Sequence, residues 1–230
     1  MIRIRAFRAP QDPATCKKFI TGHRKILEIY YGIIKITSDS NEWVDDPCSI
    51  VIVAEDTETN NIFGGARLQM SSEKYALPIE KAIQKYDPNV SILVKNEREN
   101  GGTSEVCGLW NSKEIAGMGI GSHILSMVGV AVSYQLNIKS IFVLCAPSTV
   151  RVSAAMGTKI VTSLGKNGTF YYPKDNFIAT VMKLDDVNDL SSANPKVASK
   201  ILDLKNNPRC IREEQGPKGI FKALYEINID

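Results

Sequence analysis

Three glycines at alternating positions stand between an apolar stretch and a long apolar helix pattern, in the run Ala116-Gly117-Met118-Gly119-Ile120-Gly121. Glycine lets a backbone turn tightly and bring successive N–H groups toward one ligand. The first turn of a helix adds unpaired N–H groups and a partial positive charge. The segment therefore predicts a binding loop for a phosphate or diphosphate, with a tight packing turn as the structural alternative. No lysine follows as in a P-loop, so nucleotide binding is a less favoured alternative.

Three further side chains can move a proton. Glu105 begins the apolar stretch 104–110, where partial burial would raise the pKa of its carboxyl and suit it to act as a general base. Its structural alternative is a strand-edge carboxylate paired with a lysine. Cys145 ends the apolar stretch 139–145, and Ser148 is expected to cap the next helix. Either of these two can protonate a leaving group or serve only in packing.

Arg67 lies within an otherwise apolar stretch, 62–70. A buried guanidinium is costly unless it meets a carboxylate, which Asp45, Asp46 or an acidic ligand would supply. The sequence therefore predicts a small acidic ligand, such as an amino acid, with a structural ion pair or an edge position facing water as the alternatives. Trp43 is a candidate to line the same pocket, with a core position as its alternative.

The candidate residues lie on predicted strands and helices that alternate along the chain. Period-two and β-branched runs predict strands, whereas apolar spacing of three and four with proline or asparagine boundaries predicts helices. In the strand 104–110, alternation would turn Glu105, Cys107 and Leu109 to one side. The predicted strands are 2–8, 49–54, 62–70, 104–110, 139–145, 159–162 and 177–184. The predicted helices are 12–30, 78–86, 122–136, 148–156 and 195–204, with 37–48 as an irregular loop and 221–229 ambiguous between helix and strand.

Composition excludes several classes of protein. The 230 residues are 43% hydrophobic and 23% charged, which is typical of a globular domain. A net charge of +3 indicates neither nucleic-acid nor membrane binding, and no run is long and apolar enough for a membrane span. We therefore expect a cytoplasmic protein. Five scattered cysteines without a Cys-x-x-Cys pair, together with two histidines, predict neither a disulfide framework nor a metal site.

The run from Ala116 to Leu125 resembles the acyl-CoA-binding motif of the GNAT acyltransferase superfamily, Arg/Gln-x-x-Gly-x-Gly/Ala before an apolar helix. The resemblance implies an α+β (α/β) fold: a central mixed, mostly antiparallel sheet with helices on both faces and a splay between the fourth and fifth strands. It also implies acetyl-CoA or a longer acyl-CoA as co-substrate and no metal. Ala116 stands where the family has Arg or Gln, and Val152 and Ser153 replace its tyrosine. The cofactor-binding residues so implied are Leu109, Trp110, Gly117, Met118, Gly119, Ile120, Gly121 and Ser122.

A second, partial resemblance covers the N-terminal half. Arg24, Trp43 with the two following aspartates, the run Gly65-Ala66-Arg67-Leu68 and Glu105 are similar in order and spacing to acyl-homoserine-lactone synthases and N-acyl amino acid synthases. This resemblance implies that Arg24, Trp43 and Arg67 bind the substrate. It also implies acyl carrier protein as a possible donor.

Together these features predict an N-acyltransferase that moves an acyl group from acyl-CoA, or acyl carrier protein, to the amine of a small and possibly acidic acceptor by direct attack. Two alternatives stay open: an inactive GNAT-like module that binds an acyl thioester or a partner, and an acyl-homoserine-lactone synthase-like enzyme. We expect residues 1–184 to form the acyltransferase domain, and residues 185–230 to form an extension packed on it. A homodimer also stays open.

Overall fold

The computed structural model of this chain describes residues 1–33 and 41–229. Its strands are β1 (Ile2–Arg8), β2 (Ser49–Asp56), β3 (Ile62–Met70), β4 (Thr103–Asn111), β5 (Ser140–Cys145), β6 (Lys159–Ile160), β7 (Thr169–Tyr171), β8 (Ile178–Leu184), β9 (Arg209–Gly216) and β10 (Gly219–Glu226). Its α-helices are α1 (Pro13–Tyr31), α2 (Pro78–Ile83), α3 (Asn89–Glu99), α4 (Leu125–Ser133), α5 (Pro147–Ala155) and α6 (Pro195–Asn206). A π-helical turn (Ile120–Ile124) precedes α4.

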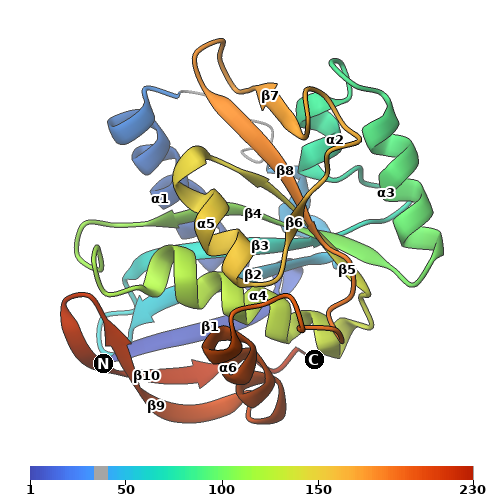
Figure 1. The fold of residues 1–230 in the computed structure, drawn as a ribbon. Helices are drawn as coiled ribbons and strands as arrows, with labels where there is room; N and C mark the ends of the chain where they lie inside the picture. The colour runs from blue at the N-terminus through green and yellow to red at the C-terminus, as the bar shows by residue number, and fades with distance from the viewer. Residues whose placement is uncertain (34–40, 230) are drawn as a thin grey trace.

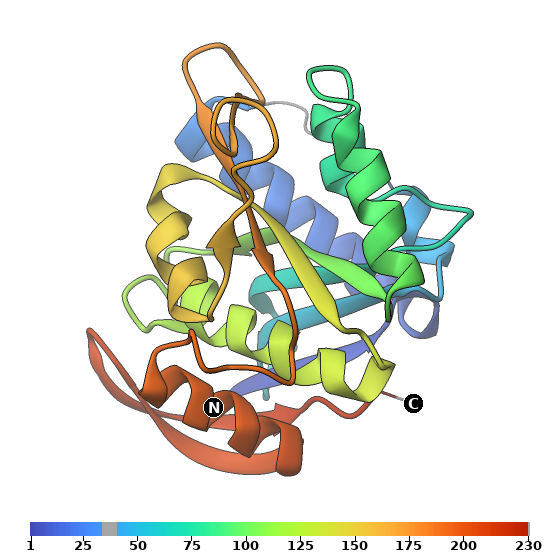
Figure 2. The same cartoon turned by 45° about the vertical axis from the view of Figure 1, so that its right-hand side comes forward.

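One mixed sheet runs through the described residues in the strand order β6-β8-β5-β4-β3-β2-β1-β10-β9, and β7 pairs with β8. The pairs β1–β10 and β4–β5 are parallel, and the other pairs are antiparallel. Helices α1, α2 and α3 lie on one face, and α4, α5 and α6 lie on the other (Figures 1 and 2). The expected fold class is confirmed.

The alternation of side chains along β2 explains how the sheet carries a core on each face. Ile50 and Ile52 point into the cluster under α4, and Val51 and Val53 point into the cluster under α1. All four side chains are fully buried. A central strand covered on both faces is expected to be apolar throughout rather than alternating. Helix α4 is buried almost all round because the sheet lies on one side of it and α6 on the other.

The strands β4 and β5 pair over only three residues. The pairs are Thr103 with Ser140, Ser104 with Ile141, and Glu105 with Phe142. Beyond Glu105, β4 continues beside β3, whereas β5 continues beside β8. The two strands therefore diverge, and the expected splay between the fourth and fifth strands is confirmed (Figure 2).

The structure also contains elements that the sequence pattern did not indicate. Helix α3 follows Pro88 and buries only Val90 and Val94, while the predicted helix 78–86 ends at Ile83. Strand β7 has three residues, and β9 is a sheet-edge strand whose Ile211 is 62% exposed, so neither shows a clear apolar face. The ambiguous segment 221–229 lies mostly in β10.

Two local expectations are corrected or limited. Ser148 does not cap α5: Ala146 is the N-cap, because Pro147 takes the first helical position, where its fixed φ and missing N–H are tolerated. In the expected loop 37–48, residues 42–45 form a short 3₁₀ helix, and residues 37–40 lie outside the described residues.

Candidate active site

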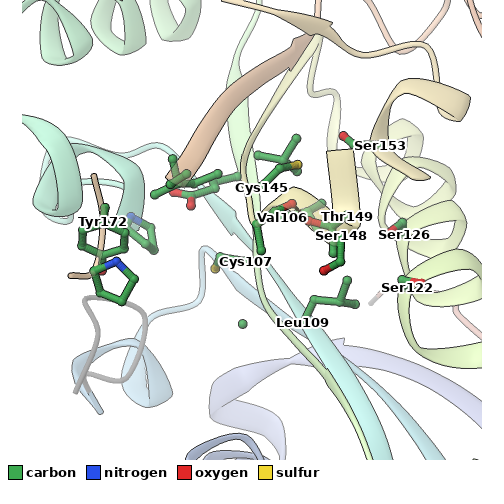
Figure 3. Close-up of a pocket in the computed structure, with 18 of the residues that line it drawn as sticks. Val106, Cys107, Leu109, Ser122, Ser126, Cys145, Ser148, Thr149, Ser153 and Tyr172 are labelled. Carbon is green, nitrogen blue, oxygen red and sulfur yellow. Dashed lines mark hydrogen bonds between the residues drawn. The ribbon is translucent and has the colours of Figure 1, made fainter. Parts of the chain in front are cut away.

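A cavity of about 230 Å³ fills the gap between the diverging strands. One wall carries the hydroxyl groups of the π-helical turn, α4 and α5, and Tyr172 lies on the opposite side of the cavity (Figure 3). Residues of α1 and of the segment 172–179 also line the cavity. The hydroxyl-bearing residues of the first wall are Ser122, Ser126, Ser148, Thr149 and Ser153. Such a wall can hydrogen-bond a polar linear arm, and the apolar remainder of the cavity suits a hydrocarbon group.

A β-bulge shapes the floor of the cavity. The register of β3 and β4 shifts between the pairs Arg67–Cys107 and Gly65–Trp110, so β4 has one extra residue, and Gly108 has a φ of +60°. Bulges take main-chain groups out of the ladder and redirect side chains. The expectation that Leu109 faces the same way as Glu105 and Cys107 is therefore wrong. The extra residue turns Leu109 to the α4 face, where it still lines the cavity.

The glycine loop ends at the hydroxyl wall. Gly117 and Gly119 have positive φ, and the π-helical turn begins with the Ile124 N–H donating to the Gly119 carbonyl, at 3.1 Å. The Met118 amide is used internally, by the carbonyl of Ile115. The amides of residues 119–122 have no acceptor among the residues that the structure describes. Four N–H groups are thus free to bind an anion at the start of the helix.

Glu105 lies at the point where β4 and β5 separate, and its side chain is only 2% exposed. Its Oε2 accepts a hydrogen bond of 2.6 Å from the main-chain N–H of Ile79. Burial raises the pKa of the carboxyl to about 8, although this hydrogen bond and the nearby charge of Arg67 act in the opposite direction. The lysine partner considered as its structural alternative does not occur within 4 Å in the described part of the chain.

Arg67 is 2% exposed, and its guanidinium carbon lies 4.6 Å from the centre of the Trp43 ring. Its neighbour Asp46 is occupied elsewhere, because its two carboxylate oxygens accept from the Gln69 side chain and the Cys48 amide. No carboxylate of a described residue lies within 4 Å of Arg67. The Trp43 Nε1 is also buried without a partner there. Arg67 and Trp43 both line a small hollow that Glu42 and Asp46 also line, and the Cys107 thiol is a hydrogen-bond partner of Arg67.

Solved structures resemble this arrangement. FeeM, an N-acyl amino acid synthase from uncultured soil microbes, matches with a TM-score of 0.62 and 14% identity over 87% of this chain and 99% of FeeM. NAA60 of Arabidopsis thaliana, in complex with acetyl-CoA, matches with a TM-score of 0.54 and 13% identity over 82% of this chain and 100% of NAA60. The chain has the GNAT fold.

A third GNAT-fold structure is the CoA-dependent acyl-homoserine lactone synthase BjaI with SAM and isopentyl-CoA, with a TM-score of 0.50 and 11% identity over 90% of each chain. No family model and no curated protein sequence matches this chain. At these levels of identity, the likeness shows the fold alone.

His23 is a site residue that the sequence patterns did not single out. In this GNAT fold it is 4% exposed and lines the cavity, and its Cε1 lies 4.0 Å from the position of a Cβ built on Gly108. Burial, helped by the charges of Arg67 and Arg24, lowers the pKa of the imidazole to about 4. His23 is therefore neutral at physiological pH. The available signal was a polar side chain at an apolar helical position.

The remaining predicted residues divide into two groups. Cys145, Ser148, Leu109 and Ser122 line the cavity of the GNAT fold. Burial raises the pKa of the Cys145 thiol, so it stays protonated. Arg24 is exposed beside Asn41, and Trp110 packs on Phe19 in the core under α1; neither lines the cavity.

The described part of the chain holds neither a metal cluster nor a membrane-spanning helix. No cluster of three His, Cys, Asp or Glu side chains suited to a metal ion occurs among residues 1–33 and 41–229. In the same part of the chain, no helix has the length and apolar character needed to cross a bilayer.

Proposed function

We propose that this chain is an N-acyltransferase that moves an acyl group from a phosphopantetheine thioester to the amine of a small acceptor. The observation that carries the proposal is the cavity in the β4–β5 splay, which is lined by the buried carboxyl group of Glu105 and by Ser122, the last residue of a loop with four free amides. A thioester needs an anion site for its phosphates, a channel for its arm and a gap where its carbonyl is open to attack. The likeness to acyltransferases of the GNAT fold supports this assignment.

The donor would lie along the hydroxyl wall. The amides of residues 119–122 suit a diphosphate, and the hydroxyls of Ser122 and Ser126, one helical turn apart, suit the amide groups of a pantetheine arm. Acyl-CoA and acyl carrier protein share this arm. The NAA60 and BjaI structures, whose ligands include acetyl-CoA and isopentyl-CoA, support CoA as the first donor to test.

The reaction would take place at the bulge. A main-chain N–H at Gly108 or Leu109 can polarise the thioester carbonyl, and one such donor is typically worth about 3 kcal/mol of barrier. The amine nitrogen bonds to the carbonyl carbon, the carbon–sulfur bond breaks, and the carboxylate of Glu105 takes one proton from the amine. The leaving thiolate takes a proton from Cys145, Ser148 or water. Direct attack needs no covalent enzyme intermediate.

The acceptor would bind on the side of α1. A carboxylate on the acceptor would give Arg67 the carboxylate partner that it lacks among the described residues, and would give the Trp43 Nε1 a hydrogen-bond acceptor, which favours an amino acid or a related acid over a simple amine. The match to FeeM, an N-acyl amino acid synthase, supports this class. Arg24 is not part of the proposed acceptor site, because it is exposed beside Asn41.

The test is thiol release with a matrix of donors and acceptors. Acetyl-CoA, long-chain acyl-CoA and an acyl carrier protein would be combined with amino acids, their amides, S-adenosylmethionine and simple amines. Release that depends on an amine supports the enzyme. Release specific to S-adenosylmethionine, with a lactone product, would identify the acyl-homoserine-lactone synthase-like alternative. A thermal shift with acyl-CoA but no release across the matrix would identify the inactive binding module.

A further inference from the structure

The turn of the β9–β10 hairpin packs directly on the glycine loop. The main-chain N–H of Lys218 donates to the carbonyl of Gly117 at 3.0 Å, and Pro217 lies 3.9 Å from the position of a Cβ on Gly119. A Cβ on Gly216 would collide with the carbonyl of Met118. Figures 1 and 2 both show the tip of the hairpin, in red, beside the loop that precedes α4. The C-terminal segment therefore helps to fix the conformation of this loop.

The side chain of Lys218 follows the same path. Its Cγ, Cδ and Cε lie 3.1, 3.0 and 2.8 Å from the position of a Cβ on Gly117, so the methylene chain runs across the bare Cα of this glycine. The lysine is exposed, and no carboxylate lies within 4 Å of its ammonium in the described chain. A free cation is thus held at the edge of the loop.

The loop itself lacks a positive side chain. Ala116 occupies the position where the resembling motif carries Arg or Gln; just before it, Glu114 is acidic, and the ammonium of Lys113 lies over the Tyr30 ring, 5.8 Å from its centre. Main-chain amides at a helix start provide only about half a charge, which falls short of the charge on a diphosphate. The hairpin brings the side chain of Lys218 to Gly117, the residue next to Ala116.

We infer that Lys218 binds the phosphate groups of a CoA donor together with the glycine loop, which makes the β9–β10 hairpin part of the donor site. The inference rests on the proposed function and adds to it a role for the C-terminal segment. It also favours free CoA as donor, because a carrier-protein donor presents a single phosphodiester already attached to a protein surface.

Titration calorimetry on the full chain tests the inference with two probes: CoA, and pantetheine, which has no phosphate. Lys218→Ala should weaken CoA binding about tenfold, as expected for loss of one hydrogen bond to a charged group, and leave pantetheine binding unchanged. Lys218→Arg should restore most of the CoA affinity. Lys222→Ala, an exposed lysine of β10, is the matched control and should bind both probes as the wild type does.

Three results would overturn the inference. They are equal CoA affinity of wild type and Lys218→Ala, an equal loss for CoA and pantetheine, and no CoA binding by the wild type. Thiol release measured in parallel separates this failure from that of the proposed function. A wild type that transfers acyl groups while Lys218→Ala binds CoA normally refutes only the role of the hairpin. If the wild type binds CoA in a way that depends on Lys218 but transfers no acyl group to any amine, only the proposed acyltransferase activity is refuted.

Discussion

The carboxylate of Glu105 meets the main-chain N–H of Ile79 at 2.6 Å, which joins the end of the β4–β5 pairing to the first turn of α2. The bond fixes one oxygen of the carboxylate at the cavity wall. A hydrogen bond to the charged form lowers a pKa, but burial dominates here and raises the pKa to about 8. At neutral pH, Glu105 is therefore mostly a protonated acid, and it becomes a proton acceptor as the pH rises.

Replacing Glu105 with Gln should lower amine-dependent thiol release at least tenfold above pH 8, within the range of about 10²–10⁴ for general bases. The wild-type rate should rise through pH 8 as the carboxyl ionises, and the Gln variant should lose that part of the rise. Rates measured from pH 6 to 9.5 check this. Glu114→Gln, at an exposed carboxylate, is the control. Superimposable pH profiles for wild type and Glu105→Gln would remove the assignment.

Glu105 should also make the folded protein less stable as the pH rises. Its pKa is about 8 in the folded chain against an ordinary value of 4.5, so the folded state keeps a proton that the unfolded state has released. Its contribution is complete below pH 4.5 and is lost as the pH rises toward 8, by up to about 1.4 kcal/mol per pH unit. Urea unfolding at pH 5, 7 and 8.5 measures this loss. Glu105→Gln should flatten the dependence, and an unchanged slope in this variant would contradict the expectation.

His23 should have the opposite effect. Its folded pKa of about 4 lies below the ordinary 6.5, so the unfolded state binds a proton first as the pH falls. The stability that it contributes is complete above pH 6.5 and is lost toward pH 4. Thermal unfolding between pH 4 and 7 should therefore show a smaller decrease for His23→Gln than for the wild type. His123→Gln, at a half-buried histidine, should change the slope less. Equal slopes for His23→Gln and wild type would show that His23 is not held neutral.

The main elements follow from local patterns, because apolar alternation, helix boundaries and glycine positions are encoded in neighbouring residues, whereas the splay is implied only by the resemblance to the GNAT superfamily. The bulge at Gly108 does not follow from local patterns, since it arises from the mismatch in register between β3 and β4 and reverses the side chosen for Leu109. His23 was missed because an imidazole at an apolar helical position looks like core until the opposite strand is known. The contact of Lys218 with Gly117 joins residues about one hundred positions apart, and no local pattern reports it.

Replacing Arg67 with Met should separate acceptors by charge. The change keeps the apolar stem against Trp43 and removes the guanidinium that has no carboxylate partner in the described chain. We expect kcat/KM to fall tenfold or more, as is typical for a lost contact to a charged group, for an amino acid but little for its amide. Thiol release with such matched pairs measures the difference. An equal loss for both members of a pair would show that Arg67 is structural.

Gly121 should be intolerant of any side chain because of Asn111. A Cβ on Gly121 would collide with the Oδ1 of Asn111, at the end of the strand that borders the cavity. Gly121→Ala should therefore displace the π-helical turn and weaken CoA binding, while most of the core stays packed. Shortening the neighbour in the double variant Gly121→Ala with Asn111→Ala should restore part of the binding, because it removes the colliding Oδ1 and Cγ and leaves only the Cβ of residue 111, at 2.8 Å. Calorimetry on the wild type, both single variants and the double variant gives the coupling energy of the two positions. Simple addition of the two single effects would mean that Gly121 is needed for another reason.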